Sequence, residues 1–303
     1  MGYASRMRLP IRPLRGRWPA WFERRAARFV WNDPRVILDE HATPDAFTTA
    51  MNAFQVGPTI KITAKNRHPA ADMLLIDNLD LTNATIVDIG ASDGSTSLDL
   101  IRKLPAFKSY IIADLYLNIT VVSFFRHEVF YDQNDECVLV CGPRCVAWPS
   151  RSRLVRLLYS PLSKLAARRP RDRRTVLLLN PEVRALMATD DRVTYAVHDV
   201  FEPWPKPAPD VIKVANLLGP YFSDEMIVRA LQALFEGLEE GGHLLMVDNG
   251  RLTGLEPRAG LYKRSGGRFA VVARTVTVPE IDQLILQVRS NQPAASLPES
   301  TAP

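Results

Sequence analysis

The feature that most constrains the fold is residues 84–99, ATIVDIGASDGSTSLD. The apolar run from Ile86 to Ile89 is typical of a strand buried in a parallel sheet. It ends at Gly90, where the missing side chain permits a tight turn and the close approach of a ligand. A helix is expected from Ser95 to Leu104, with its free N–H groups facing that turn. The segment therefore predicts a strand, a binding turn and a helix in succession.

The same alternation continues along the chain. Further strands are predicted at residues 110–113, 193–197, 210–214 and 243–247, and a helix capped by Ser223 at residues 223–240. Residues 269–278 and 281–288 are predicted to form an antiparallel closing pair. The expected fold is α/β, with a Rossmann-like, mostly parallel sheet, helices on both faces and an antiparallel closing strand.

The remaining segments suggest the domain organisation. Residues 1–69 are expected to form a basic N-terminal arm and helical cap, residues 70–289 the main domain, and residues 290–303 a disordered tail. Residues 116–190 are too many for a simple crossover and predict an α/β insertion after the second strand, serving as a lid or docking surface. Within it we expect a hairpin over residues 128–148 and a basic helix over residues 151–169, broken near Pro161.

Positive charge is concentrated in two segments. Residues 1–35 hold nine arginines against Glu23 and Asp33, and residues 151–174 hold eight arginines and Lys164 against Asp172. The rest of the chain is acidic, although the whole carries a net charge of +5. This distribution argues against a nucleic-acid partner. Residues 151–174 also carry leucines among the cations, which suits peripheral contact with an anionic membrane or an acidic partner. The alternative is a lid helix whose cations are solvated.

The sequence has three cysteines, Cys137, Cys141 and Cys145, which are too few for a disulfide scaffold. They favour a reduced, cytoplasmic setting. If the basic segment binds lipid, the protein is expected at the periphery of the membrane. Their spacing could suit a zinc site with His127 as a fourth ligand, but small apolar strand residues explain it more simply. We therefore expect no metal. No apolar run of eighteen residues predicts a membrane-spanning helix.

The spacing Asp-x-Gly-x-x-x-Gly, from Asp88 to Gly94, resembles the first motif of the Rossmann-like (class I) S-adenosylmethionine (SAM)-dependent methyltransferases. The stretch DVIKVANLL, residues 210–218, resembles the motif that the family places before the methyl group. The stretch LEEGGHLLMVD, residues 238–248, is similar to the family's entry into the fifth strand. The resemblance covers most of residues 70–115 and 190–290. Ser92 departs from the middle glycine that is common in the family.

The resemblance implies SAM as the cofactor and a role for each matching residue. Asp88 and the backbone of Gly90 and Gly94 would orient the methionine part, with Ser92 between them. Asp114 would bind the ribose and Asp199 the adenine, while Asn216 would lie near the methyl group. The implied cofactor-binding residues are Asp88, Gly90, Ser92, Gly94, Asp114, Asp199 and Asn216.

Other cofactors fit the turn less well. A nicotinamide-binding turn needs Gly-x-Gly-x-x-Gly, and Ser92 removes the middle glycine. A pyrophosphate would meet the carboxylates of Asp88 and Asp93, whereas SAM carries positive charge. The P-loop pattern is missing, because no Gly-Lys-Ser/Thr follows the turn.

The expected activity is methyl transfer from SAM to a small-molecule acceptor. The leucine-rich basic segment is compatible with a lipid-like acceptor. A general base is needed only where the acceptor must lose a proton. The catalytic candidates are His198, Asn216, Tyr221 and His127, and each also has a plain structural explanation. The alternative is a non-catalytic SAM-binding or regulatory protein on the same fold. The acceptor and the oligomeric state stay open.

Overall fold

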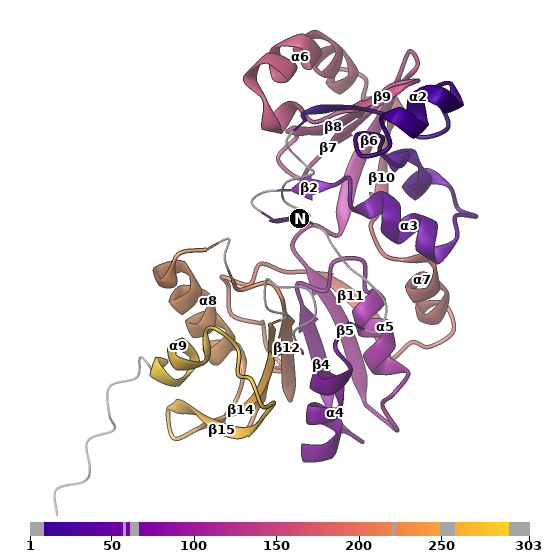
Figure 1. The fold of residues 1–303 in the computed structure, drawn as a ribbon. Coiled ribbons are helices and arrows are strands. Elements are labelled where there is room, and N and C mark those ends of the chain that lie inside the picture. Colours follow the sequence, from indigo (N-terminus) through magenta and orange to yellow (C-terminus); the bar gives the residue numbers. More distant parts are fainter. Residues whose placement is uncertain (1–8, 57–58, 61–66, 220–221, 249–257, 291–303) are drawn as a thin grey trace, which may run out of the picture. The chain divides into compact units, whose positions relative to one another are not determined.

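The computed structural model describes residues 9–56, 59–60, 67–219, 222–248 and 258–290 (Figure 1). The chain divides into two compact units. The first contains residues 1–67, 91–99 and 114–197, and the second contains residues 68–90, 100–113 and 198–303. Among the described residues, no helix is long and apolar enough to cross a membrane.

The larger sheet has seven strands in the order β11-β5-β4-β12-β13-β14-β15. Their bounds are Thr85–Ile89 (β4), Ser109–Asp114 (β5), Val193–Val197 (β11), Val211–Ala215 (β12), His243–Asp248 (β13), Arg258–Ser265 (β14) and Arg268–Arg274 (β15). Strands β5, β4, β12 and β13 run parallel, whereas β14 and β15 are antiparallel additions beyond β13. The Rossmann-like, mostly parallel sheet with antiparallel closure is thus confirmed.

Helices pack on both sides of this sheet (Figure 1). Helix α8 (Asp224–Gly237) begins where the Ser223 hydroxyl caps the Met226 N–H, with two acidic residues in the first turn. Its apolar face packs with Ile212, Val214 and Met246, which are alternate residues of neighbouring strands. Helix α4 (Pro69–Asn78) contacts strands β13, β14 and β15. The sheet is therefore covered by helices, as the strand pattern predicts.

The end of the chain corrects one prediction. Residues 281–288 are not a strand: Asp282–Gln287 form helix α9, and the closing hairpin is made by β14 and β15. The apolar residues Ile281, Leu284, Ile285 and Val288 belong to one core cluster. Their spacing of three and four residues matches one face of a helix and not the two-residue period of a strand.

A second sheet of six antiparallel strands lies in the first unit, in the order β1-β9-β8-β7-β6-β10. The bounds are Ile11–Pro13 (β1), Asn118–Phe124 (β6), His127–Tyr131 (β7), Cys137–Cys141 (β8), Cys145–Ala147 (β9) and Arg173–Leu177 (β10). Strand β1 pairs with β9, so the N-terminal segment and the insertion share one sheet. The predicted hairpin over residues 128–148 is present as β7, β8 and β9, with Asp132 closing its first turn.

The remaining α-helices of the described residues complete the fold. They are α2 (Ala20–Arg25), α3 (Pro44–Met51), α5 (Ser95–Ile101), α6 (Arg153–Ala167) and α7 (Pro181–Met187), and β2 (Gln55–Val56) pairs with β3 (Thr59–Ile60). Helix α6 continues through Pro161, where a break was predicted. Pro161 and Leu157 are both exposed, so the Leu157 carbonyl that loses its helical partner can be hydrated.

Candidate functional site

The turn between β4 and α5 has an unusual backbone. Gly90, Ser92 and Gly94 all have positive φ angles, of 78°, 59° and 78°. The Gly90 N–H donates to the Ala113 carbonyl of neighbouring β5 over 2.8 Å, and a Cβ at Gly90 would lie 2.7 Å from the Leu217 side chain. Glycine is thus required at position 90 by both backbone angle and space. Ser92 adopts the same left-handed backbone conformation, although it lacks the conformational freedom of glycine.

Asp114, the last residue of β5, holds this turn in place. Its Oδ2 accepts a hydrogen bond from the Ser92 N–H over 2.9 Å, and its Oδ1 accepts one from the Tyr116 N–H over 2.8 Å. The side chain of Ser92 has a buried hydroxyl with no hydrogen-bond partner among the described residues. Asp114 retains 8% exposure. A carboxylate oxygen can accept more than one hydrogen bond, so this group can bind a further donor.

Asp88 lies beneath the turn and is buried. Its Oδ2 accepts hydrogen bonds from the Tyr110 hydroxyl at 2.9 Å and from the Lys213 ammonium at 3.1 Å. Lys213, in the middle of β12, is itself fully buried. The pairing balances charge between adjacent parallel strands, because a buried lysine needs a partner. Lys213 was not among the residues predicted for the site, although a lysine inside the apolar run DVIKVA is a visible signal.

Asp93 is engaged on the other side of the turn. Its Oδ1 accepts from the Ser95 N–H at the start of α5, and its Oδ2 accepts from the Thr48 hydroxyl of α3, each over 3.0 Å. Asn180, the N-cap of α7, donates to the hydroxyls of Thr48 and Ser95. These polar residues, all buried except the partly exposed Thr48, connect three helices. Asp93 is thereby a structural cap, consistent with the preference for aspartate at helix starts.

Asn216 follows β12 and is a second strained position, with a φ of 55°. Its N–H donates to the Val247 carbonyl over 2.9 Å, and its side-chain Nδ2 lies 3.3 Å from Nε2 of buried His68. Positive φ at a non-glycine residue costs free energy and marks a position that its surroundings enforce. His68 directly precedes α4 and was not among the residues predicted for the site.

Asp199 and His198 follow β11. Asp199 Oδ1 accepts from the Phe201 N–H over 3.0 Å, which closes a short turn. The His198 ring packs 4.8 Å from the Trp204 ring, and its buried Nε2 has no hydrogen-bond partner among the described residues. Burial lowers the pKa of His198 below its ordinary value, which favours the neutral imidazole. A neutral imidazole can accept a proton, which keeps His198 a candidate base.

The other two catalytic candidates are less informative. His127 lies in β7 of the six-stranded sheet with its ring against Gly142, and burial lowers its pKa. Tyr221 lies outside the described residues.

Among the described residues, the cysteines do not form a metal site. Burial raises the pKa of the Cys137 thiol to about 12. Within the described part of the chain, no group of three or more potential ligands is arranged to hold a metal ion.

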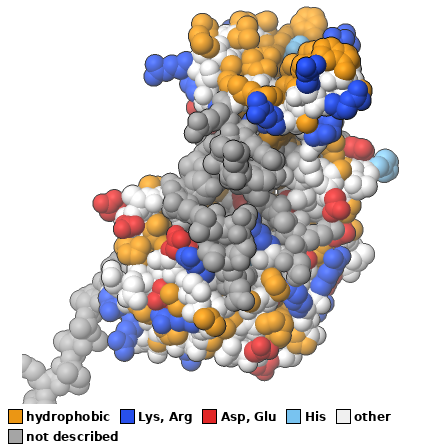
Figure 2. Space-filling model, viewed as in Figure 1, with side chains coloured by type: hydrophobic (Ala, Val, Ile, Leu, Met, Phe, Trp, Pro, Cys, Tyr) orange, Lys and Arg blue, Asp and Glu red, His pale blue; other side chains and the backbone are white. Residues whose placement is uncertain are grey.

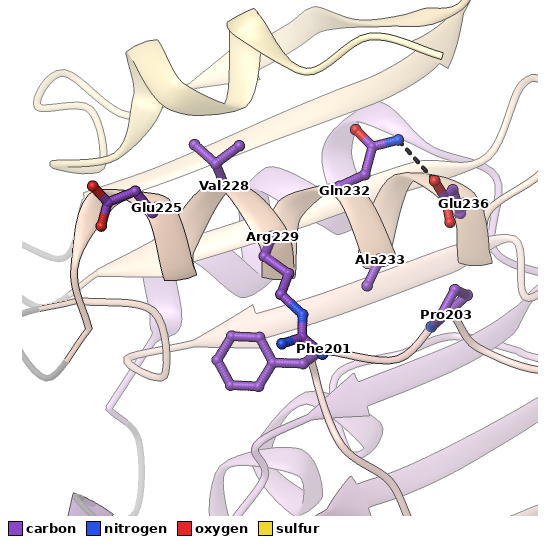
Figure 3. A pocket seen from close by; sticks show the side chains of 8 residues that line it. All are labelled: Phe201, Pro203, Glu225, Val228, Arg229, Gln232, Ala233 and Glu236. Carbon is purple, nitrogen blue, oxygen red and sulfur yellow. Dashed lines mark hydrogen bonds between the residues drawn. The ribbon is translucent and has the colours of Figure 1, made fainter. Parts of the chain in front are cut away.

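A surface groove of about 390 Å³ lies along α8 (Figure 3). It is lined by Phe201, Pro203, Glu225, Val228, Arg229, Gln232, Ala233 and Glu236. The Arg229 guanidinium lies 5.5 Å from the Phe201 ring centre, and Gln232 donates to Glu236. None of the residues predicted to bind the cofactor lines this groove, so it is separate from the turn after β4.

Comparisons with known proteins complete this description. No family model and no curated protein matches the sequence. Among solved structures, the chain is similar to an O-methyltransferase family 2 protein from Planctomyces limnophilus in complex with apigenin, with 16% identity and a TM-score of 0.31 over 59% of this chain and 36% of that one. It is also similar to a mitomycin 7-O-methyltransferase, with 16% identity and a TM-score of 0.32 over 71% and 42% of the two chains.

A third similar structure is an N-methyltransferase from Bradyrhizobium japonicum in complex with S-adenosyl-L-homocysteine, with 17% identity and a TM-score of 0.31 over 60% of this chain and 59% of that one. The chain thus spans less than two thirds of each of these three proteins. The functional assignment therefore rests on the residues of this chain.

Proposed function

We propose that this chain binds SAM at the carboxyl ends of β4, β5 and β12 and transfers its methyl group to a small-molecule acceptor. The observation that carries the proposal is the contact of Asp114 with the Ser92 N–H, which fixes an acidic side chain beside a glycine-framed turn. In open parallel sheets, ligands bind outside the carboxyl ends of the strands. Ser92 belongs to residues 88–94, which resemble the first motif of class I methyltransferases, and Asp114 stands where that resemblance implies the ribose-binding acid.

The donors and acceptors at this edge suit SAM. Asp114 would accept hydrogen bonds from the ribose hydroxyls, and Asp199 from the adenine amino group. The backbone of Gly90 and Gly94, with the Ser92 hydroxyl, would contact the methionine part. Asp88 would act from below as a positioning residue, since its carboxylate is already paired with Lys213 and Tyr110.

A phosphate-bearing cofactor suits the same turn less well. Asp93 is part of the turn and Asp114 lies beside it, and both carboxylates would repel a pyrophosphate. The favourable anion site expected at a helix start is used instead by Asp93, which caps α5. The chemistry of the turn thus favours a cofactor that lacks phosphate.

SAM supplies a methyl group that is activated by a sulfonium. In the transfer, an electron pair of the acceptor forms the new bond to the methyl carbon while the carbon–sulfur bond breaks and its electrons pass to sulfur. Such a displacement needs alignment and a dry site more than covalent help from the protein. Asn216, held by His68 at the end of β12, would orient the acceptor, and His198 would take a proton from acceptors that release one.

Calorimetric titration of the full chain with SAM and with S-adenosylhomocysteine tests the proposal. We expect Asp114→Asn to weaken SAM binding by about 10- to 100-fold, because a hydrogen bond to a charged group contributes about 1.5–3 kcal/mol. The matched control is Asp191→Asn, an exposed aspartate remote in sequence from the motif, which should bind SAM as the parent chain does.

The proposal is wrong if the folded chain gives no heat with SAM at millimolar concentration, or if NADH binds in its place. Equal affinities of Asp114→Asn and the parent chain would refute the ribose contact. Tight SAM binding with no transfer of labelled methyl groups to any acceptor of a small-molecule panel would favour the non-catalytic alternative.

A further inference from the structure

Helix α6 has one face packed and the opposite face open. Val155 and Ala166 are buried, and Tyr159 and Leu162 pack on a cluster that includes Val122, Phe124, Val129 and Val140 of the six-stranded sheet. The Tyr131 hydroxyl donates to the Ser163 carbonyl over 2.6 Å, which fixes the helix against the sheet. The orientation of α6 is therefore set by contacts within its own unit.

The open face carries leucines. Leu154, Leu157, Leu158 and Leu165 are 79%, 73%, 66% and 49% exposed. They recur at the three- and four-residue spacing that places side chains on one side of a helix. Helices seldom carry a second apolar stripe on the face exposed to solvent. Contiguous exposed apolar patches of this kind mark interaction surfaces.

Phe125 adds an aromatic tip to this region. It is 86% exposed, at the turn between β6 and β7, with a φ of 52°. The centre of its ring lies 4.6 Å from the ring centre of Phe124. The Arg169 guanidinium lies 4.7 Å from the ring centre of Phe124 as well. Arg169 follows α6 closely in sequence, so Phe125 and the end of α6 are neighbours.

Cations surround the leucines. Arg153, Arg156, Lys164, Arg168 and Arg169 are all exposed, and residues 151–171 contain seven basic residues and no acidic one. Figure 2 shows this mixture of apolar and basic side chains on the unit that contains α6. The nearest acidic residue in sequence, Asp172, pairs with Arg169 at 3.7 Å.

We infer that the exposed face of α6, with Phe125, docks onto an anionic lipid bilayer. Leucines and an aromatic ring enter the boundary between headgroups and acyl chains, while arginine and lysine beside them meet acidic headgroups. A second copy of this chain would bring like charges together. An acidic protein would match the cations but would leave the apolar stripe without a complementary environment.

Vesicle flotation of the full chain tests this inference. With vesicles of phosphatidylcholine containing about 30% phosphatidylglycerol, we expect binding that falls with added salt, and at least about tenfold weaker binding to phosphatidylcholine alone. The triple variant L154S/L157S/L158S should lose at least about tenfold in binding to the anionic vesicles. The pair R153Q/R156Q should weaken binding to the anionic vesicles only.

The matched control is M226S/V228S/V276S, which removes three exposed apolar side chains elsewhere on the protein and should bind like the parent chain. Circular dichroism establishes that each variant is folded. Absent or salt-independent binding by the parent chain overturns the inference, as does unchanged binding of L154S/L157S/L158S. Self-association in solution that this variant abolishes would overturn it in favour of a second copy.

Discussion

At the scale of single residues, the turn after β4 is held by backbone strain and by one carboxylate. Ser92 has a φ of 59° and gives its N–H to Asp114. The left-handed region costs an ordinary residue about 1–2 kcal/mol, and more for a β-branched side chain. The position that is commonly glycine in the resembling family is thus one where glycine relieves strain.

Substitution of Ser92 tests this account. Ser92→Gly should change the free energy of unfolding by less than about 1 kcal/mol, whereas Ser92→Val should lower it by about 2 kcal/mol or more. Urea denaturation followed by circular dichroism measures both. Asp77→Val, at an exposed helical position outside the turn, is a control for the effect of branching. Equal stabilities of the glycine and valine variants at position 92 would contradict the strain.

The buried pair of Lys213 and Asp88 gives a second prediction at this scale. Lys213→Met should lower the free energy of unfolding by about 3–5 kcal/mol, because it leaves the Asp88 carboxylate buried without its ammonium partner. In the double variant K213M/D88N the charge is removed as well, so part of the loss should be regained. A double variant less stable than K213M alone would show that the two groups do not act as a pair.

The residues that sequence reasoning identified are those that a local pattern marks. Gly90 and Gly94 are explained by their positive φ angles, and Asp114 by its place at the end of a strand. Lys213, His68 and Thr48 could not be connected to the site in this way, since their partners lie 125, 148 and 45 residues away in the chain. Long-range pairing between buried polar groups leaves no periodic signal.

At the scale of elements, helix α9 shows how tertiary contacts replace a predicted strand. Asp282 in its first turn accepts a 2.5 Å hydrogen bond from the Tyr262 hydroxyl of β14 and pairs with Arg274 of β15 at 2.8 Å. Strands β14 and β15 thus anchor the helix through one buried carboxylate. The helical spacing of residues 281, 284, 285 and 288 can be recognised in the sequence, but the contacts of the Asp282 carboxylate cannot.

Removing this anchor should loosen α9. We expect Asp282→Ala to lower the free energy of unfolding by about 2–4 kcal/mol, because the Tyr262 hydroxyl and Arg274 lose a buried, charge-assisted partner. Hydrogen exchange should accelerate in residues 282–288. Gln287→Ala, at the exposed last position of the same helix, is the control. If Asp282→Ala leaves exchange in this helix unchanged, α9 is held by its apolar face alone.

At the scale of the whole molecule, three partly buried histidines should set how stability responds to mild acid. Burial lowers the pKa of His127, His198 and His243 in the folded chain below the ordinary value of 6.5. Unfolding exposes all three, so the unfolded chain binds protons first as the pH falls. Their contribution to stability is therefore complete above pH 6.5 and is lost as the pH falls through the folded values.

Urea midpoints measured between pH 7.5 and pH 5.5 should accordingly decrease as the medium becomes more acidic, and His198→Gln should reduce that decrease. Asp72 acts in the opposite direction: burial raises its pKa, so its contribution is complete at low pH and is lost on passing upward from the unfolded value near 4. The control is His41→Gln, since His41 is exposed. A midpoint that does not change over this range would show that the partly buried imidazoles do not control acid sensitivity, and a slope unaltered by His198→Gln would exclude His198.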